Sequence, residues 1–133
     1  MKTMPKLVVI LIAFLTVGGC AAIYELYNAF YNVILESKYV DHFNVAELLG
    51  THPTKLKISG HPFYSGMVVR AVTEKKDGPT IIVSVHLAVI GLVKPKTTGM
   101  FEYEVSVPDS VNEVRFGRSS TLIWKRGSSS GHP

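Results

Sequence analysis

The first twenty residues constrain this chain more than any other stretch, because they decide where the remainder folds. Lys2 and Lys6 precede an uncharged, largely apolar segment of 11 residues, Leu7 to Val17, and small residues follow up to Cys20. A cationic start, a short apolar segment and small residues at a cleavage point are typical of a bacterial secretory signal. Since spanning a bilayer takes about 20 residues, the segment is short for a transmembrane helix. Residues 1–19 are predicted to be a signal peptide.

Cys20 is the only cysteine and the predicted site of lipidation. The tetrapeptide Val17-Gly18-Gly19-Cys20 resembles the lipobox of bacterial lipoproteins, in which the cysteine receives fatty acids such as palmitate and becomes the new N-terminus. Ala21 resembles the residue that lets such proteins proceed to the outer membrane instead of the inner one. With one cysteine, no intramolecular disulfide can form. The expected location is the bacterial cell envelope, membrane-anchored and facing the periplasm, with the outer membrane favoured.

An uncleaved N-terminal anchor is the alternative. The chain stays apolar through Ile23, and the first charge after Lys6 is Glu25, so one helix could extend across the predicted cleavage point. Two consecutive glycines oppose this, because each costs about 1 kcal/mol relative to alanine in a helix interior. Both alternatives place the rest of the chain outside the cytoplasm, since the lysines of the N-terminus stay inside.

Length and charge limit what the remainder can be. Without residues 1–19, 114 of the 133 residues remain, which is enough for one small domain. The 14 Lys and Arg against 10 Asp and Glu become 12 against 10 once Lys2 and Lys6 are removed. A surplus of two does not indicate nucleic-acid binding, which requires a basic cluster or stripe.

Residues 20–53 are predicted to form a lipidated N-terminus and a membrane-proximal helical segment. Apolar and aromatic residues recur at helical spacing from Ile23 to Leu35, which favours a helix that lies at the membrane interface or packs on the domain as core. Asn44 is suited to cap a second, short helix over residues 45–49, which Gly50 would end.

Residues 54–126 have the alternation and turn signals of a mainly β domain. Six strands are expected, over residues 55–59, 64–73, 80–92, 101–107, 111–116 and 121–124. Turns are expected at Gly60-His61-Pro62 and at Asp77-Gly78, with residues 80–92 as the central strand. The predicted fold is a small antiparallel, immunoglobulin-like β-sandwich, with a small β-barrel as the alternative. Residues 127–133 are expected to be a flexible tail.

Catalytic signatures are weak in this sequence. Ser84 and His86 share one face of the central strand, yet no Gly-x-Ser-x-Gly motif accompanies them. Glu102 and Glu104 alternate with apolar residues, as on a solvated strand face. The histidine spacing suits no metal site, and no phosphate-binding loop is present. We therefore expect no catalytic residues, no metal and no cofactor.

A partner surface is predicted where aromatic residues lie beside glycines. His61, Phe63 and Tyr64 fall in the segment from Gly60 to Gly66. Aromatic side chains are enriched at binding hot spots, which favours an envelope protein as the partner. The competing interpretation is that Phe63 and Tyr64 close one end of the sandwich as core.

The second half of the chain carries a pattern of strand and turn residues. They are Val85-His86-Leu87, Gly99-x-Phe101-x-Tyr103, Val107-Pro108-x-x-Val111-x-x-Val114-x-Phe116-Gly117 and Ile123-Trp124. This pattern resembles small uncharacterised envelope lipoproteins of proteobacteria with a β-sandwich domain, without pointing to a named family. The resemblance implies the fold and the envelope location, and it supplies no active site.

These features predict a membrane-anchored envelope lipoprotein that presents a non-catalytic β-sandwich as a binding or structural module. One alternative is a small envelope hydrolase that uses Ser84 and His86. Another is an inhibitor or exclusion factor that acts on an envelope component.

Overall fold

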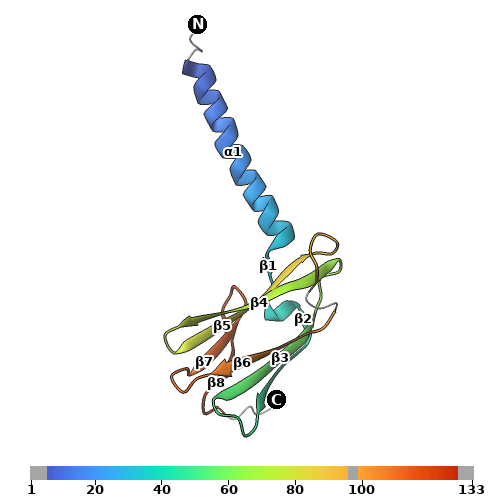
Figure 1. The fold of residues 1–133 in the computed structure, drawn as a ribbon, viewed down its shortest axis with the longest axis vertical. Helices are drawn as coiled ribbons and strands as arrows, with labels where there is room; N and C mark the ends of the chain where they lie inside the picture. The colour runs from blue at the N-terminus through green and yellow to red at the C-terminus, as the bar shows by residue number, and fades with distance from the viewer. Residues whose placement is uncertain (1–5, 96–98, 129–133) are drawn as a thin grey trace.

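A single helix projects from a β-sandwich in the computed structural model (Figure 1). The structure describes residues 6–95 and 99–128, with the backbone alone for residues 6–17. Helix α1 runs from Lys6 to Tyr31 and passes through Gly18 and Gly19 without a break. The predicted helix over residues 23–35 is thus correct up to Tyr31. It ends there because Val33 and Ile34 pair with the sheet as strand β1.

Eight strands form two separate sheets in the described part of the chain. One sheet holds β1 (Val33–Ile34), β4 (Met67–Asp77), β5 (Thr80–Val89), β7 (Glu113–Phe116) and β8 (Thr121–Lys125). The other holds β2 (Val40–Leu48), β3 (Thr54–Pro62) and β6 (Phe101–Val107). A short 3₁₀ helix, η1 (Ser37–Tyr39), connects β1 to β2. The prediction of a small, mainly β sandwich is confirmed, and the two sheets do not close into the barrel that was the alternative.

Strand β5 is the centre of the larger sheet, as its sequence predicts. It pairs along its whole length with β4 on one side. On its other side β1 pairs with the C-terminal half of β5, and β7 pairs with the N-terminal half. Alternate side chains point into the core, from Ile81 to Leu87, whereas Ile82, Ser84 and His86 are only partly buried. The β5–β7 pair is parallel, so the sandwich is not purely antiparallel as expected.

The segment before residue 54 belongs to the sandwich, which corrects two predictions. Residues 40–48 form strand β2, so the short helix predicted over residues 45–49 with Asn44 as its cap is absent. Pairing with β3, such as Val45 with Ile58, overrides the local helix propensity of this stretch. The strands of the sandwich therefore begin at Val33, ahead of the predicted domain start at residue 54.

Strand β3 continues through the predicted turn at residues 60–62. Gly60 pairs with Phe101, and its Cα approaches the side chain of Val40 so closely that an added Cβ would clash with it. The glycine therefore allows close packing between strands and does not turn the chain. By contrast, the hairpin expected at Asp77-Gly78 is present, with Gly78 at a φ of 55° and Asp77 paired with Thr80.

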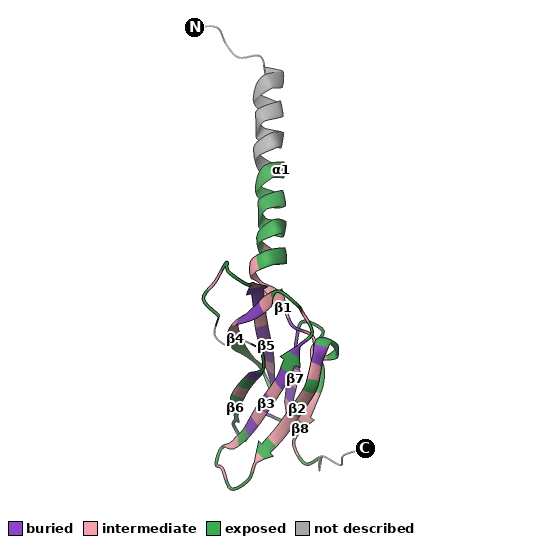
Figure 2. Ribbon diagram, turned by 90° about the vertical axis from the view of Figure 1, so that its right-hand side faces the viewer, coloured by how far each residue is buried: buried purple, intermediate pink, exposed green. Residues whose placement is uncertain are grey.

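The core lies between the two sheets, where the strands carry their buried residues (Figure 2). Phe116 of β7 stacks on Phe101 of β6 at 6.3 Å and meets Phe43 of β2 edge-to-face at 5.0 Å, so aromatic rings join the sheets. The helix residues that carry burial colours in Figure 2 are mostly exposed. Residues 129–133 of the predicted tail lie outside the described residues.

Candidate functional site

The predicted partner residues divide between surface and core. Phe63 is 66% exposed, and His61 is exposed at the end of β3. Tyr64 instead packs against the core and meets the ring of Tyr39 edge-to-face at 5.6 Å. The backbone holds this segment in place, because Phe63 N donates to Tyr39 O at 2.9 Å. His61 and Phe63 are therefore accessible, and their role in binding stays a prediction.

His86 is part of a polar network at the junction of helix and sheet. Its Nδ1 lies 2.7 Å from Asn32 Oδ1, and its Nε2 lies 2.9 Å from Thr73 Oγ1. Since the amide oxygen only accepts, Nδ1 carries the proton and Nε2 accepts from the threonine hydroxyl. Arg70 Nη2 donates to the same Asn32 oxygen at 3.0 Å, and Arg70 Nε is buried without a hydrogen-bond partner.

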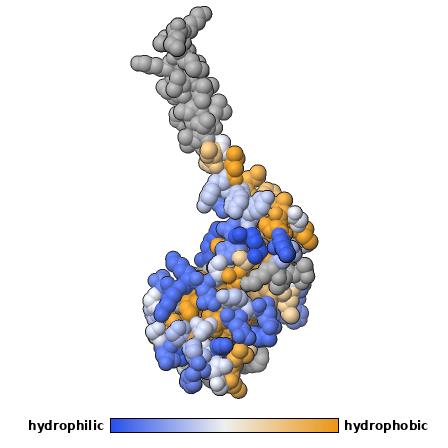
Figure 3. Space-filling model, in the orientation of Figure 1, coloured by the Kyte–Doolittle hydropathy of each residue, from blue (hydrophilic) through white to orange (hydrophobic). Residues whose placement is uncertain are grey.

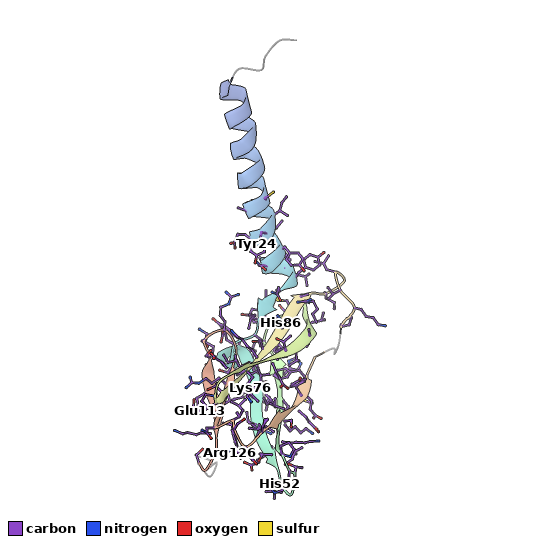
Figure 4. All side chains as sticks on the ribbon, turned by 60° about the vertical axis from the view of Figure 1, so that its left-hand side comes forward. Tyr24, His52, Lys76, His86, Glu113 and Arg126 are labelled. Carbon is purple, nitrogen blue, oxygen red and sulfur yellow. The ribbon has the colours of Figure 1, made fainter. Side chains whose placement is uncertain are left out.

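Two effects lower the pKa of His86 below its ordinary value of 6.5. Burial is the larger one, and the positive charge of Arg70 is the second. Both disfavour the imidazolium form, so the neutral ring is the form that this network holds near pH 7. In Figure 4 His86 lies just beneath the end of α1, where it joins the helix terminus to the sheet.

This geometry bears on the hydrolase alternative. A Ser–His pair needs a histidine nitrogen free to take the serine proton. Both ring nitrogens of His86 already have partners, and the group behind Nδ1 is the amide of Asn32, where a carboxylate would suit a triad. The contacts of His86 therefore favour a structural role.

The paired carboxylates lie on a solvated strand face. Glu102 and Glu104 are exposed on β6, and Glu102 Oε2 pairs with Lys57 Nζ at 2.9 Å. Within residues 6–95 and 99–128, no three or more His, Cys, Asp or Glu side chains are grouped as metal ligands would be.

The base of α1 carries an apolar surface that sequence analysis found only in part. We call it the junction patch; it comprises the groove residues Ile23, Leu26, Tyr27, Phe30, Tyr31 and Leu92, to which we add Ile90, exposed two residues before Leu92 in the chain. The five helix residues and Leu92 line a groove of about 310 Å³, and Tyr27 stacks on Tyr31 at 5.0 Å. Figure 3 shows the orange, hydrophobic side chains gathered where the helix meets the sandwich. The helical spacing predicts the five helix residues, whereas the two loop residues were assigned to the central strand.

The opposite side of the helix base is mixed and carries the polar helix residues. A second hollow of about 390 Å³ is lined there by Glu25, Asn28, Ala29, Asn32, Val33, Ile34, Glu36 and Arg118. Glu36 is fixed there, because its carboxylate accepts from Ser119 N at 3.1 Å and from the Ser119 hydroxyl. The described half of α1 is thus amphipathic, with its two faces opening onto different parts of the sandwich.

Cys20 is exposed and free on the projecting part of the helix. It precedes the first strand, which starts at Val33, so it contributes nothing to the two sheets. In the described part of the chain, no helix is both long enough and apolar enough to cross a membrane. The first five residues of the predicted signal, and the side chains of residues 6–17, lie outside what the structure describes.

Comparison with known proteins gives no relative: no family model matches the chain, and no curated protein or solved structure is significantly similar to it.

Proposed function

We propose that this protein is a lipoprotein of the bacterial cell envelope that holds a β-sandwich at the membrane as a non-catalytic binding or structural module. The observation that carries the proposal is the order of residues at the N-terminus: two lysines, the apolar segment 7–17 and a small-residue approach to Cys20. Lipidation of Cys20 would then anchor the mature chain to the membrane. A second contact between the protein and the membrane would stabilise this anchorage.

The position of Cys20 supports this proposal. The described residues that cleavage before Cys20 would remove, 6–19, lie in α1, so the sandwich from Val33 to Lys125 would stay complete. The thiol is free and exposed, and no contact of the sandwich depends on it. The remaining helix, residues 21–31, would keep the lipid on Cys20 close to the sandwich. The end of the sandwich that points away from the helix would stay free.

The module itself is proposed to act by binding or by supporting the envelope. His86 is occupied by Asn32 and Thr73, and the carboxylates of β6 face solvent, so these groups are accounted for without chemistry. A binding module is also the simplest use of a small sandwich whose inner faces are filled by its own core.

Replacing Cys20 by serine tests the anchor. We expect Cys20→Ser to abolish incorporation of a labelled fatty acid and to leave a precursor that retains residues 1–19. Ala22→Ser is the matched control, because it introduces the same hydroxyl two residues further on and leaves the thiol in place. Mass spectrometry of the membrane fraction measures the mass of both variants. A Cys20→Ser protein that matures to the same mass as the parent chain would rule out lipoprotein processing.

A further inference from the structure

The exposed apolar side chains of this protein are concentrated at one end. Among the described residues, ten of the twelve large exposed hydrophobic side chains lie on α1 or on the connections at the helix-proximal end of the sandwich. These ten are Ile23, Tyr24, Leu26, Tyr27, Phe30, Tyr39, Phe63, Ile90, Leu92 and Met100. The exceptions are Leu49 in the opposite hairpin and Leu122 on β8. Scattered exposed apolar residues are ordinary, but a contiguous group marks an interaction surface.

The junction patch is built from two separate parts of the chain. Its helix residues recur at three- and four-residue spacing, so they share one face of α1. Ile90 and Leu92 come from the loop after β5 and are 62% and 48% exposed. Backbone bonds fix this loop, since Ile90 N donates to Gly66 O at 2.8 Å and Leu92 N to Val89 O at 3.2 Å. The loop therefore presents these side chains as part of the folded sandwich.

The course of α1 toward Cys20 indicates that the membrane covers the junction patch. The same helix continues N-terminally to Cys20, which is proposed to carry the lipid, so the patch adjoins the part of the chain proposed to meet the membrane. Its composition suits a membrane interface, because tyrosine rings lie beside aliphatic side chains and the exposed Lys94 follows Leu92. The polar face of the helix, with Glu25 and Asn28, is turned to the other hollow and away from the patch.

We propose that the junction patch is a membrane-docking surface that seats the helix-proximal end of the sandwich on the lipid bilayer. Ile90 and Leu92 enter the boundary between the headgroups and the acyl chains beside the helix residues, to a depth of about 5–10 Å as for interfacial amphipathic helices. This inference rests on the proposed membrane anchorage. It goes beyond that proposal by fixing the orientation of the sandwich, with the hairpin around Leu49 facing away from the membrane.

Tryptophan fluorescence in brominated-lipid vesicles tests the docking surface in the protein purified from membranes, in the form to which the cell processes it. Trp124 is the only tryptophan, so Leu92→Trp in a Trp124→Phe background reports on the patch alone. Leu49→Trp, at a side chain 93% exposed at the other end, is the matched control. If the background variant does not fold, the same two substitutions are measured with Trp124 retained and the parent signal subtracted. We expect about a twofold loss of emission for Leu92→Trp and none for Leu49→Trp, because bromine quenches only rings that reach the acyl region.

The outcomes separate this inference from the proposed lipidation. Quenching of the Leu92→Trp variant without fatty-acid labelling of Cys20 keeps the docking surface and overturns the lipoprotein processing. Labelling without quenching overturns the docking surface. A blue-shifted but unquenched emission from the Leu92→Trp variant would mean that a second copy or another protein covers the patch, and it would also overturn lipid docking.

Discussion

Gly117 lies where three segments of the fold meet. Its nitrogen donates to Val83 O at 3.0 Å, and its φ of 76° is one that side-chain-bearing residues rarely adopt. An added Cβ would lie 3.0 Å from Leu35 O and would overlap the carboxylate of Glu36. Gly117 thus lets the ends of β1 and β7 approach each other beside β5.

Gly117→Ala is expected to lower the free energy of unfolding by about 1–3 kcal/mol, from backbone strain and from the displaced Glu36 carboxylate. Gly127→Ala is the matched control, because Gly127 has nearly the same φ, 77°, with no atom within 4 Å of an added Cβ. Urea denaturation followed by circular dichroism measures both. Equal losses of unfolding free energy for the two variants would show that the overlap with Glu36 does not contribute to the destabilisation.

His86 gives the protein a predicted pH dependence. Because the pKa of His86 in the folded state is below 6.5, the unfolded chain binds more protons than the folded chain once the pH falls toward and below 6.5. The stability that the neutral ring contributes is therefore complete above pH 6.5 and is lost as the pH falls toward the lowered pKa. We expect His86→Gln, which can still donate to Asn32, to flatten the decline in unfolding free energy between pH 7 and pH 5. A slope unchanged from the parent protein would assign the decline to other groups.

Each open side of the sandwich is bridged by an aromatic side chain and a carboxylate. Tyr103 of β6 donates to Glu74 Oε1 of β4 at 3.0 Å, and Trp124 of β8 donates to Glu47 Oε2 of β2 at 3.1 Å. Each bond joins strands of different sheets, so the two layers are tied along both sides as well as through the core.

A double-mutant cycle on Tyr103 and Glu74 measures one of these ties. Tyr103→Phe is expected to cost about 0.5–1.5 kcal/mol of unfolding free energy in the parent chain, because it removes the hydroxyl donor. In a Glu74→Ala background the same change is expected to cost much less, since the acceptor is gone. Equal costs in both backgrounds would mean that Tyr103 acts through other contacts.

The strands differ in how far their own sequence predicts them. Apolar and polar residues alternate along β6 and in the middle of β5, so the sequence alone predicts which side chains of these strands face the core. β2 could not, because its residues 45–49 have good helix propensity and only pairing with β3 makes them a strand. β1 is two residues long and gains its state from β5, more than 50 residues away in the chain. Such long-range pairing leaves no local signal.

The same limit applies to the candidate site at the scale of the whole molecule. The apolar face of α1 is a local pattern and was predictable, and the N-terminal signal, which is also a local pattern, stays a prediction. The junction patch and the His86 network combine segments far apart in the chain, such as Asn32 with Thr73. Folding brings these segments together through β1, whereas the predicted domain start at residue 54 separated Asn32 and the residues of α1 from His86 and Leu92.

The place of β1 within the larger sheet determines how the protein would bear tension on its anchor. A pull on α1 reaches the sandwich at Asn32 to Glu36, which are held by His86, by the Leu35–Val85 backbone bond and by Ser119. The load thus falls on β5, a strand with neighbours on both sides, and not on a strand at the rim. Under the proposed membrane anchorage, tension on α1 would therefore pass through β1 to β5, the strand of the larger sheet that has neighbours on both sides.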